Sequence, residues 1–205
     1  FRRVLFRSWM WGQNDKGQLG NSDLTHRSSP TQVGSLTNWK QVSCGRDQTY
    51  AIKTDGTLWS WGHNDKGALA LGDTTHRSSP VQVGSLTNWK QVDGGFNFAG
   101  AIKTDGTLWM WGENFRGTLG QDNQTDRSSP VQVGSLTNWK LVSCGSYQHA
   151  GAVKTDGTLW TWGRNYRGQL GIGDTSDKSS PTQVGLLTNW KLISCGEEFT
   201  VMVND

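Results

Sequence analysis

The sequence predicts an all-β fold: a β-propeller built from about four repeats of four antiparallel strands. A Trp-x-Trp-Gly phrase begins at Trp9, Trp59, Trp109 and Trp160, so the chain repeats itself every 50 or 51 residues. Internal repeats of roughly this length are typical of solenoids and propellers. Each repeat also contains four short strand-like runs separated by turn residues, which is the pattern of one propeller blade.

The second repeat gives the predicted strands in order: 88–93, 99–103, 108–112 and 128–134. Between the second and third strands lies Asp105-Gly106. An Asp-Gly pair between extended runs predicts a tight hairpin in which both central residues have positive φ. The other repeats carry the same signals.

Tryptophan is placed for packing between blades. All twelve tryptophans recur at fixed repeat positions, eight in the Trp-x-Trp pairs and four in the phrase Thr-Asn-Trp-Lys. The two-residue period of a strand puts both members of a pair on one face. These large aromatic side chains are therefore predicted to fill the space between neighbouring blades, with a ligand cage as the alternative.

Proline marks the predicted outer edge of each blade. The four prolines, Pro30, Pro80, Pro130 and Pro181, each begin the predicted fourth strand. Proline lacks the N–H that pairs strands, so it belongs at a strand start or on an edge strand. An outermost strand also needs such protection against pairing with other chains.

The ends of the chain leave the closure of the ring open. Residues 1–8 do not match the repeat and are expected to be a tag, a junction or an artefact, whereas residues 9–205 form one repeat domain. Residues 9–34 could complete the blade begun by 187–204 and close a small ring. Alternatively, the chain is an arc of a larger propeller, and either forms a homodimer or is part of a longer protein. An open arc would expose a tryptophan-rich face that favours association.

Charge and composition restrict the partners. The formal net charge of +3 is accounted for by Arg2, Arg3 and Arg7, so the repeats are neutral and a nucleic-acid partner is not expected. No apolar run is long enough to cross a bilayer, so a membrane partner is not expected either. The three cysteines share one repeat position and are expected to be small buried apolar residues: Cys44, Cys144 and Cys195. Their use leaves the compartment unassigned but favours the reducing cytoplasm.

The string A-I-K-T-D-G-T-L-W-x-W-G-x-N-x-x-G-x-L-G, with its S-S-P-x-Q-V and V-S-C-G segments, resembles the repeat of the regulator of chromosome condensation family over residues 9–205. Members of that family are usually seven-bladed, so four units resemble a fragment or a reduced form. The near-identical units are similar to those of bacterial members, some of which inhibit enzymes or bind surface partners, and favour a bacterial or metagenomic source. The family's Gly-x-x-His-Thr signature is kept only in part, as His149 in the third repeat. The eukaryotic namesake is a nucleotide exchange factor for a small GTPase.

The repeats differ mainly in two loops, one between strands one and two and the other between strands three and four. In an up-and-down blade both loops emerge at the same end, so they are predicted to form one face. Aromatic and charged residues on rigidly held loops are typical of recognition surfaces; drift after duplication is the alternative. The predicted partner-binding residues are Arg46, Asp47, Phe96, Asn97, Phe98, Phe115, Arg116, Tyr147, His149, Tyr166, Arg167, Glu197, Glu198 and Phe199.

Catalytic residues, metal ligands and cofactors are not predicted. The histidines, His26, His63, His76 and His149, lie in unrelated loop contexts without the spacing of a nucleophile–base pair or a metal site. The sequence therefore predicts a non-enzymatic module that binds a protein partner of unknown identity through its variable loops. A guanine nucleotide exchange regulator of a small GTPase is the alternative, and a sugar-processing propeller is the third hypothesis.

Overall fold

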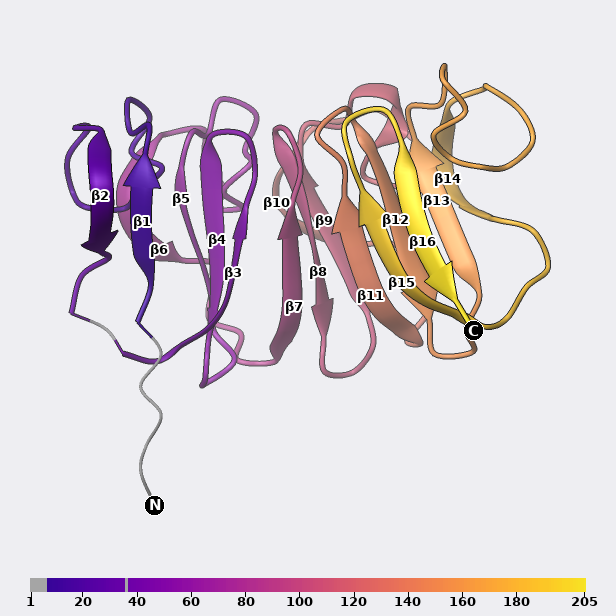
Figure 1. The fold of residues 1–205 in the computed structure, drawn as a ribbon, viewed down its shortest axis with the longest axis horizontal. Coiled ribbons are helices and arrows are strands. Elements are labelled where there is room, and N and C mark those ends of the chain that lie inside the picture. The colour runs from indigo at the N-terminus through magenta and orange to yellow at the C-terminus, as the bar shows by residue number, and fades with distance from the viewer. Residues whose placement is uncertain (1–6, 36) are drawn as a thin grey trace.

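The computed structural model describes residues 7–35 and 37–205, which form five antiparallel sheets (Figure 1). Three complete blades are flanked by two half-blades. The N-terminal half-blade has β1 (Trp9–Gly12) and β2 (Arg27–Gln32). The first blade has β3 (Trp39–Cys44), β4 (Gln48–Lys53), β5 (Leu58–Gly62) and β6 (Arg77–Gln82).

The second blade has β7 (Trp89–Gly94), β8 (Phe98–Lys103), β9 (Leu108–Gly112) and β10 (Arg127–Gln132). The third blade has β11 (Trp139–Cys144), β12 (His149–Lys154), β13 (Leu159–Gly163) and β14 (Lys178–Gln183). The C-terminal half-blade has β15 (Trp190–Cys195) and β16 (Thr200–Asn204). A short 3-10 turn, η1 (Phe115–Gly117), follows β9, and no helix of the described residues is long and apolar enough to cross a membrane.

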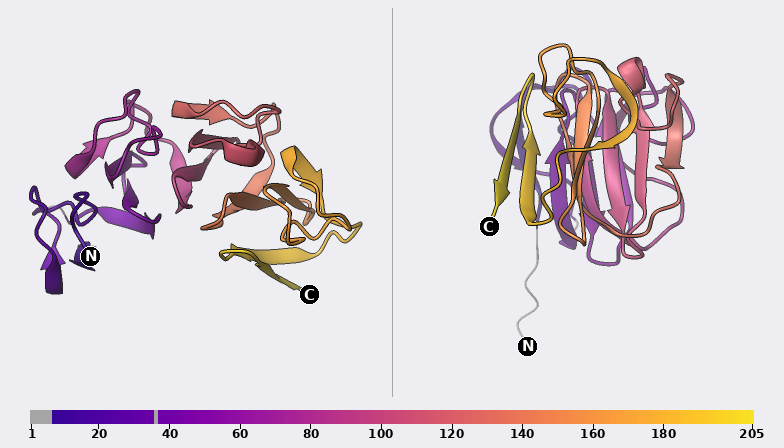
Figure 2. Two further views of the ribbon diagram at one scale, coloured as in Figure 1. Left: turned by 90° about the horizontal axis from the view of Figure 1, so that it is seen from above. Right: turned by 90° about the vertical axis from the view of Figure 1, so that its right-hand side faces the viewer.

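The blades stand side by side in an open arc whose two ends lie apart (Figure 2). Strands β1–β2 and β15–β16 belong to separate sheets, so the small closed ring does not form and the chain is the arc given as the alternative. The predicted exposure of an aromatic face is confirmed at the N-terminal end, where Trp11 is 61% exposed. Of the expected N-terminal segment, residues 1–6 lie outside the described residues.

The tryptophans fill the seams between blades, as predicted. In the second blade the ring of Trp89 contacts those of Trp109 and Trp111, with both pairs of ring centroids 6.3 Å apart. This group packs against the preceding blade in one buried cluster with Tyr50 and Ile52. The indole N–H of Trp111 also donates to the carbonyl of Ala68 in that blade at 2.9 Å. Each seam therefore combines apolar burial with a directional bond.

The turn between β8 and β9 differs from its prediction. Only Gly106 has a positive φ, 78°, whereas Asp105 does not. The Gly106 N–H donates to the carbonyl of Lys103, and the Lys103 N–H to that of Thr107, both at 3.0 Å. A three-residue loop with a bulge thus replaces the two-residue turn, and it needs one glycine rather than two residues at positive φ.

The third strand, β9, has the predicted bounds 108–112, but the other three strands of the second blade differ from their predictions by one residue or more. Strand β8 begins at Phe98, and β10 begins at Arg127, so Pro130 is the fourth of six residues rather than the first. The pairing of β10 with β9 shifts register between Arg127 and Val131, which leaves room for a residue without an N–H. The prediction that this strand forms the outer edge is confirmed, because β10 pairs only with β9.

One repeat position carries backbone strain. Gly20, Gly120 and Gly171 have φ values of 72°, 66° and 65°, and the first blade holds Ala70 there with φ 60°. A side chain in this left-handed region costs about 1–2 kcal/mol. The methyl group of Ala70 is also buried in the cluster that contains Trp111.

Replacement of the strained residue, Ala70→Gly, is expected to stabilise the chain by roughly 1 kcal/mol, because relief of strain exceeds the extra entropy that glycine loses on folding. Urea unfolding measures the change. The control is Ala68→Gly, at a buried position with negative φ, which is expected to destabilise. Destabilisation by Ala70→Gly would show that the methyl contact outweighs the strain.

Candidate functional site

Two kinds of loop meet on one edge of the arc, at the top of Figure 1. The backbone N–H of His63, in the β5–β6 loop, donates to the carbonyl of Asp47, in the β3–β4 loop, at 2.8 Å. The second blade repeats this bond between Glu113 and Asn97 at 2.9 Å. We call this edge the variable-loop face, formed by residues 13–26, 45–47, 63–76, 95–97, 113–126, 145–148, 164–177 and 196–199. The predicted gathering of these loops is confirmed.

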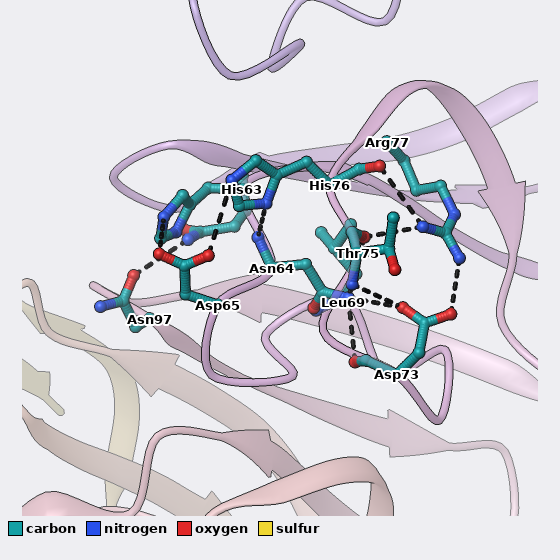
Figure 3. A network of polar contacts seen from close by, with 10 residues as sticks. His63, Asn64, Asp65, Leu69, Asp73, Thr75, His76, Arg77 and Asn97 are labelled. Atoms are coloured by element: carbon teal, nitrogen blue, oxygen red, sulfur yellow. Dashed lines mark hydrogen bonds and ion pairs between the residues drawn. The ribbon is translucent and has the colours of Figure 1, made fainter.

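A buried asparagine holds each long loop in shape (Figure 3). In the first blade the side-chain amide of Asn64 donates to the carbonyls of Asp73 and Thr75 at 3.0 and 3.1 Å. Its oxygen accepts the N–H of Leu69 at 2.8 Å. The same bonds recur around Asn14, Asn114 and Asn165. Because the loops are fixed from inside, residues at their tips can differ between repeats.

Arginines stack on aromatic rings across this face. The guanidinium of Arg46 lies 4.5 Å from the ring centre of Phe96 in the next blade. Arg164 lies 4.3 Å from the ring centre of Tyr147 and 4.2 Å from that of Tyr166. A hollow of about 180 Å³ is lined by Phe96, Ser146, Tyr147, Gln148 and Arg164. Arg164 was not among the predicted binding residues, although its position just after a strand end and two residues before the variable Tyr166 was a usable signal.

Ion pairs join neighbouring loops but contribute little stability. Arg116 lies 3.2 Å from Asp177, and Arg167 lies 3.8 Å from Glu198, which also accepts a hydrogen bond from Tyr166. These groups are substantially exposed, so solvent screens their attraction. Their main effect is to fix the positions of charges that a partner would meet.

The structure sorts the predicted partner-binding residues into three groups. The exposed ones are Arg46, Phe115, Arg116, Tyr166, Arg167, Glu197 and Phe199. The half-buried ones are Asp47, Phe96, Asn97, Tyr147 and Glu198. The interpretation of Phe98 and His149 as surface residues is wrong, because both are buried.

The reason for this error is one residue of strand register. Phe98 and His149 begin β8 and β12 instead of ending the loops, and their side chains point into the seam with the following blade. The His149 ring accordingly lies 3.2 Å from the Thr200 hydroxyl. Phe199, the residue immediately before Thr200, belongs to the C-terminal half-blade at the end of the arc, and it is 59% exposed.

His63, Asp65 and His76 lie together on this face (Figure 3). The interpretation of His63 and His76 as histidines in unrelated loop contexts is therefore wrong. The Nε2 atom of His63 is 2.9 Å from Asp65, and that of His76 is 3.6 Å from the same carboxylate. The Nδ1 atom of His76 accepts the N–H of Asn64 at 3.0 Å, so its neutral ring carries the proton on Nε2.

Histidines that bind a metal usually donate their other ring N–H to an acceptor. In His76 the Nδ1 atom instead accepts a backbone N–H, so this ring has no second N–H to donate. The buried Nδ1 of His63 has no hydrogen-bond partner among residues 7–35 and 37–205. The cluster is therefore better suited to hydrogen bonding than to holding a metal ion.

The cysteines and a carboxylate line the inner side of the arc. Cys144 is buried as predicted, but Cys44 is exposed and Cys195 is half-buried, so the expectation of three buried cysteines is wrong. The β7 residue Asp93 accepts hydrogen bonds from the Ser43 hydroxyl at 2.9 Å and the Cys144 N–H at 2.8 Å. Burial raises the pKa of the Asp93 carboxyl despite these bonds. All three cysteines lie on the first strands of their sheets, along the inner side of the arc.

A family model of the RCC1-like domain matches residues 6–205. The chain belongs to the RCC1-like domain family. This membership confirms the resemblance found in the repeat, while the bacterial or metagenomic source stays an expectation. Ultraviolet-B receptor UVR8 of Arabidopsis thaliana is 33% identical over 199 residues, which cover 95% of this chain and 34% of that protein.

Probable E3 ubiquitin-protein ligase HERC3 of Homo sapiens is 44% identical over 57 residues, 27% of this chain and 5% of that protein. Among solved structures, human WBSCR16 is 25% identical with a TM-score of 0.86, over 98% of this chain and 54% of its own. Prp20p from Saccharomyces cerevisiae is 23% identical with a TM-score of 0.81, and the match covers 95% of this chain and 50% of the Prp20p chain. The RCC1-like chain thus spans about half of these structures and a third or less of the two curated relatives.

The buried histidine makes the stability of this RCC1-like chain sensitive to acid. Burial lowers the pKa of His149 from 6.5 to about 4, although a backbone hydrogen bond at Phe199 opposes the shift. Since the folded state prefers the neutral ring, its contribution to stability is complete above pH 6.5 and is lost as pH falls towards 4. The loss is expected to be on the order of 3 kcal/mol.

Urea unfolding at pH 7 and pH 4.5 tests this prediction. His149→Gln introduces the residue that Gln48 provides at the same position of the first blade. The variant is expected to lose clearly less stability on acidification than the unmodified chain. Equal losses would show that His149 is not the acid-sensitive group.

Proposed function

We propose that this RCC1-like chain is a non-enzymatic interaction module that binds a protein partner through the variable-loop face. The main support is the set of arginine–aromatic contacts, in which Arg46 covers Phe96 and Arg164 lies against Tyr147 and Tyr166. Arginine and tyrosine are enriched among the residues that dominate binding energy at protein interfaces. In this chain they lie on the one edge where the repeats differ.

The rigidity of the loops also favours this function. The buried asparagines fix each loop from within, so few side chains lose freedom when a partner binds. Oppositely charged groups alternate across the face, with Arg167 near Glu198 and Arg116 near Asp177. Such a mixed pattern suits a protein surface of mixed charge better than a uniformly charged polymer.

A partner-binding experiment can distinguish this face from the rest of the surface. A photoreactive residue at position 147 is expected to cross-link a partner from the source cells, whereas one at Lys140, an exposed β11 residue near the opposite edge, is not. With the purified partner, Tyr147→Ala and Arg164→Ala should each weaken binding at least tenfold, about 1.4 kcal/mol. Lys140→Ala is the matched control and should leave the affinity unchanged. Equal weakening by the control, or no effect of both loop variants, would contradict the proposal.

A guanine nucleotide exchange regulator of a small GTPase is the second candidate. Its support is the shared fold with Prp20p, a protein studied for its binding to Gsp1p and histones. An assay of nucleotide release from candidate GTPases separates the two functions. An interaction module leaves the release rate unchanged, whereas an exchange regulator accelerates it in a manner abolished by loss of the variable-loop residues.

A further inference from the structure

Three equivalent clefts open between successive sheets on the outer rim of the arc. We call them the rim clefts; in chain order their volumes are about 410, 470 and 520 Å³. Each is lined by the segment after the outer strand of one sheet and by the tryptophans and outer proline of the next. The second cleft, for example, is lined by Val83, Leu86, Trp89, Lys103, Trp109 and Pro130.

A largely buried lysine side chain lies beside each cleft. Lys103 and Lys154 line the second and third clefts, and Lys53 lies over two tryptophans that line the first. Lys53, Lys103 and Lys154 are each only 6% exposed, and their Nζ atoms lie 3.4, 3.6 and 3.7 Å from the ring centres of Trp59, Trp109 and Trp160. Within the described part of the chain, these ammonium groups have neither a hydrogen-bond acceptor nor an ion-pair partner. A cation over an aromatic face is stabilised by the ring, but the described residues supply no acceptor for its three N–H donors.

The nearest carboxylates do not take these donors. Asp105 lies in the turn after Lys103, but its Oδ1 atom accepts the N–H and hydroxyl of Thr107 at 3.0 and 2.7 Å. Asp55 and Asp156 are bound in the same way. Burial accordingly lowers the pKa of all three lysines, with a smaller opposing effect of the neighbouring aspartates.

A second unsatisfied donor lies beside each lysine. The indole Nε1 atoms of Trp39, Trp89 and Trp139 are buried, and none has an acceptor in residues 7–35 and 37–205. Other tryptophans do have acceptors: Trp109 donates to Thr107 and Trp111 to Ala68. A buried donor without an acceptor costs about 1–3 kcal/mol. The Nε1 atom of Trp190, which pairs with Asn204 instead of a lysine, is also without an acceptor among the described residues, so the lysine is the group that distinguishes the clefts.

We propose that each rim cleft binds the carboxylate of a small ligand with a flat apolar body. The lysine ammonium pairs with the carboxylate while it keeps its contact with the two tryptophan rings. The apolar body then lies against the half-exposed tryptophan, the valine and the proline that line the cleft. A charge-assisted bond of this kind is stronger than one between neutral groups, and the volumes match small-molecule sites.

The clefts are not identical in charge. Asp122 lines the third cleft, where its carboxylate accepts hydrogen bonds from two serine hydroxyls. The lining of the second cleft includes Arg77, which is paired with Asp73 at 2.6 Å, and contains no carboxylate. The second cleft is therefore expected to bind an anion more tightly than the third. The C-terminal half-blade has Asn204 in place of the lysine and would not form such a site.

Titration of the chain with 4-fluorophenylacetate, followed by calorimetry and fluorine NMR, tests the proposal. Three saturable sites are expected, and Lys103→Met should remove one of them while its apolar stem still packs on Trp109. Lys103→Arg should retain all three. The control Lys90→Met, at an exposed β7 position with the same change of charge, should also retain three sites.

Two further measurements on the unmodified chain test the proposal even if Lys103→Met does not fold. The uncharged amide 4-fluorophenylacetamide should bind at least tenfold more weakly than the carboxylate. Inorganic phosphate should fail to displace the carboxylate at equal concentration, because it lacks the apolar body. Absence of saturable binding, equal binding of the amide, displacement by phosphate, or three sites remaining in folded Lys103→Met would overturn the proposal.

Discussion

A four-stranded blade with two apolar faces must be covered on both sides, and the rest of the structure depends on this constraint. In this chain one face of each blade presents three tryptophans, and the other presents aliphatic side chains together with Tyr50, Phe98 or His149, so each seam joins unlike surfaces. The N–H of Trp111 bonded to Ala68 fixes how far one blade can slide over the next. Exposure of Trp11 at one end and Phe199 at the other shows where this covering stops.

The seams allow the loop edge to vary. Packing between blades uses the strand faces, and the loops are closed by the buried Asn64 and its equivalents, so neither requires particular side chains at the loop tips. Arginine–aromatic contacts such as Arg164 on Tyr147 can therefore differ from blade to blade without changing the fold. The opposite holds at the rim clefts, whose lysine and tryptophans recur because the seam itself creates them. The proposed partner site therefore lies on an edge that varies between blades, and the proposed ligand sites lie on a rim that repeats.

Much of the architecture could be predicted because it repeats. The spacing of the tryptophan pairs predicts both the blades and the seams, and the gathering of two loops on one edge follows from strand alternation. The burial of Phe98 and His149 could not be predicted, because a shift of one residue at a strand start turns a side chain from the surface into the seam. The meeting of His63 with His76 depends on how Asn64 closes its loop. The lack of a protein acceptor for the Lys103 ammonium depends on which polar groups lie near it in the folded chain. Neither property is visible in spacing alone.

Hydrogen exchange of the indole N–H groups, followed residue by residue by NMR, tests the seam most directly. Trp61, Trp111 and Trp162 donate to carbonyls of the preceding sheet and are fully buried, whereas Trp11 is 61% exposed. The first three should exchange only through large opening or global unfolding, at least a hundredfold more slowly than Trp11, which corresponds to about 2.7 kcal/mol. Exchange of Trp111 as fast as that of Trp11 would contradict the claim that the tryptophan seams hold the arc together.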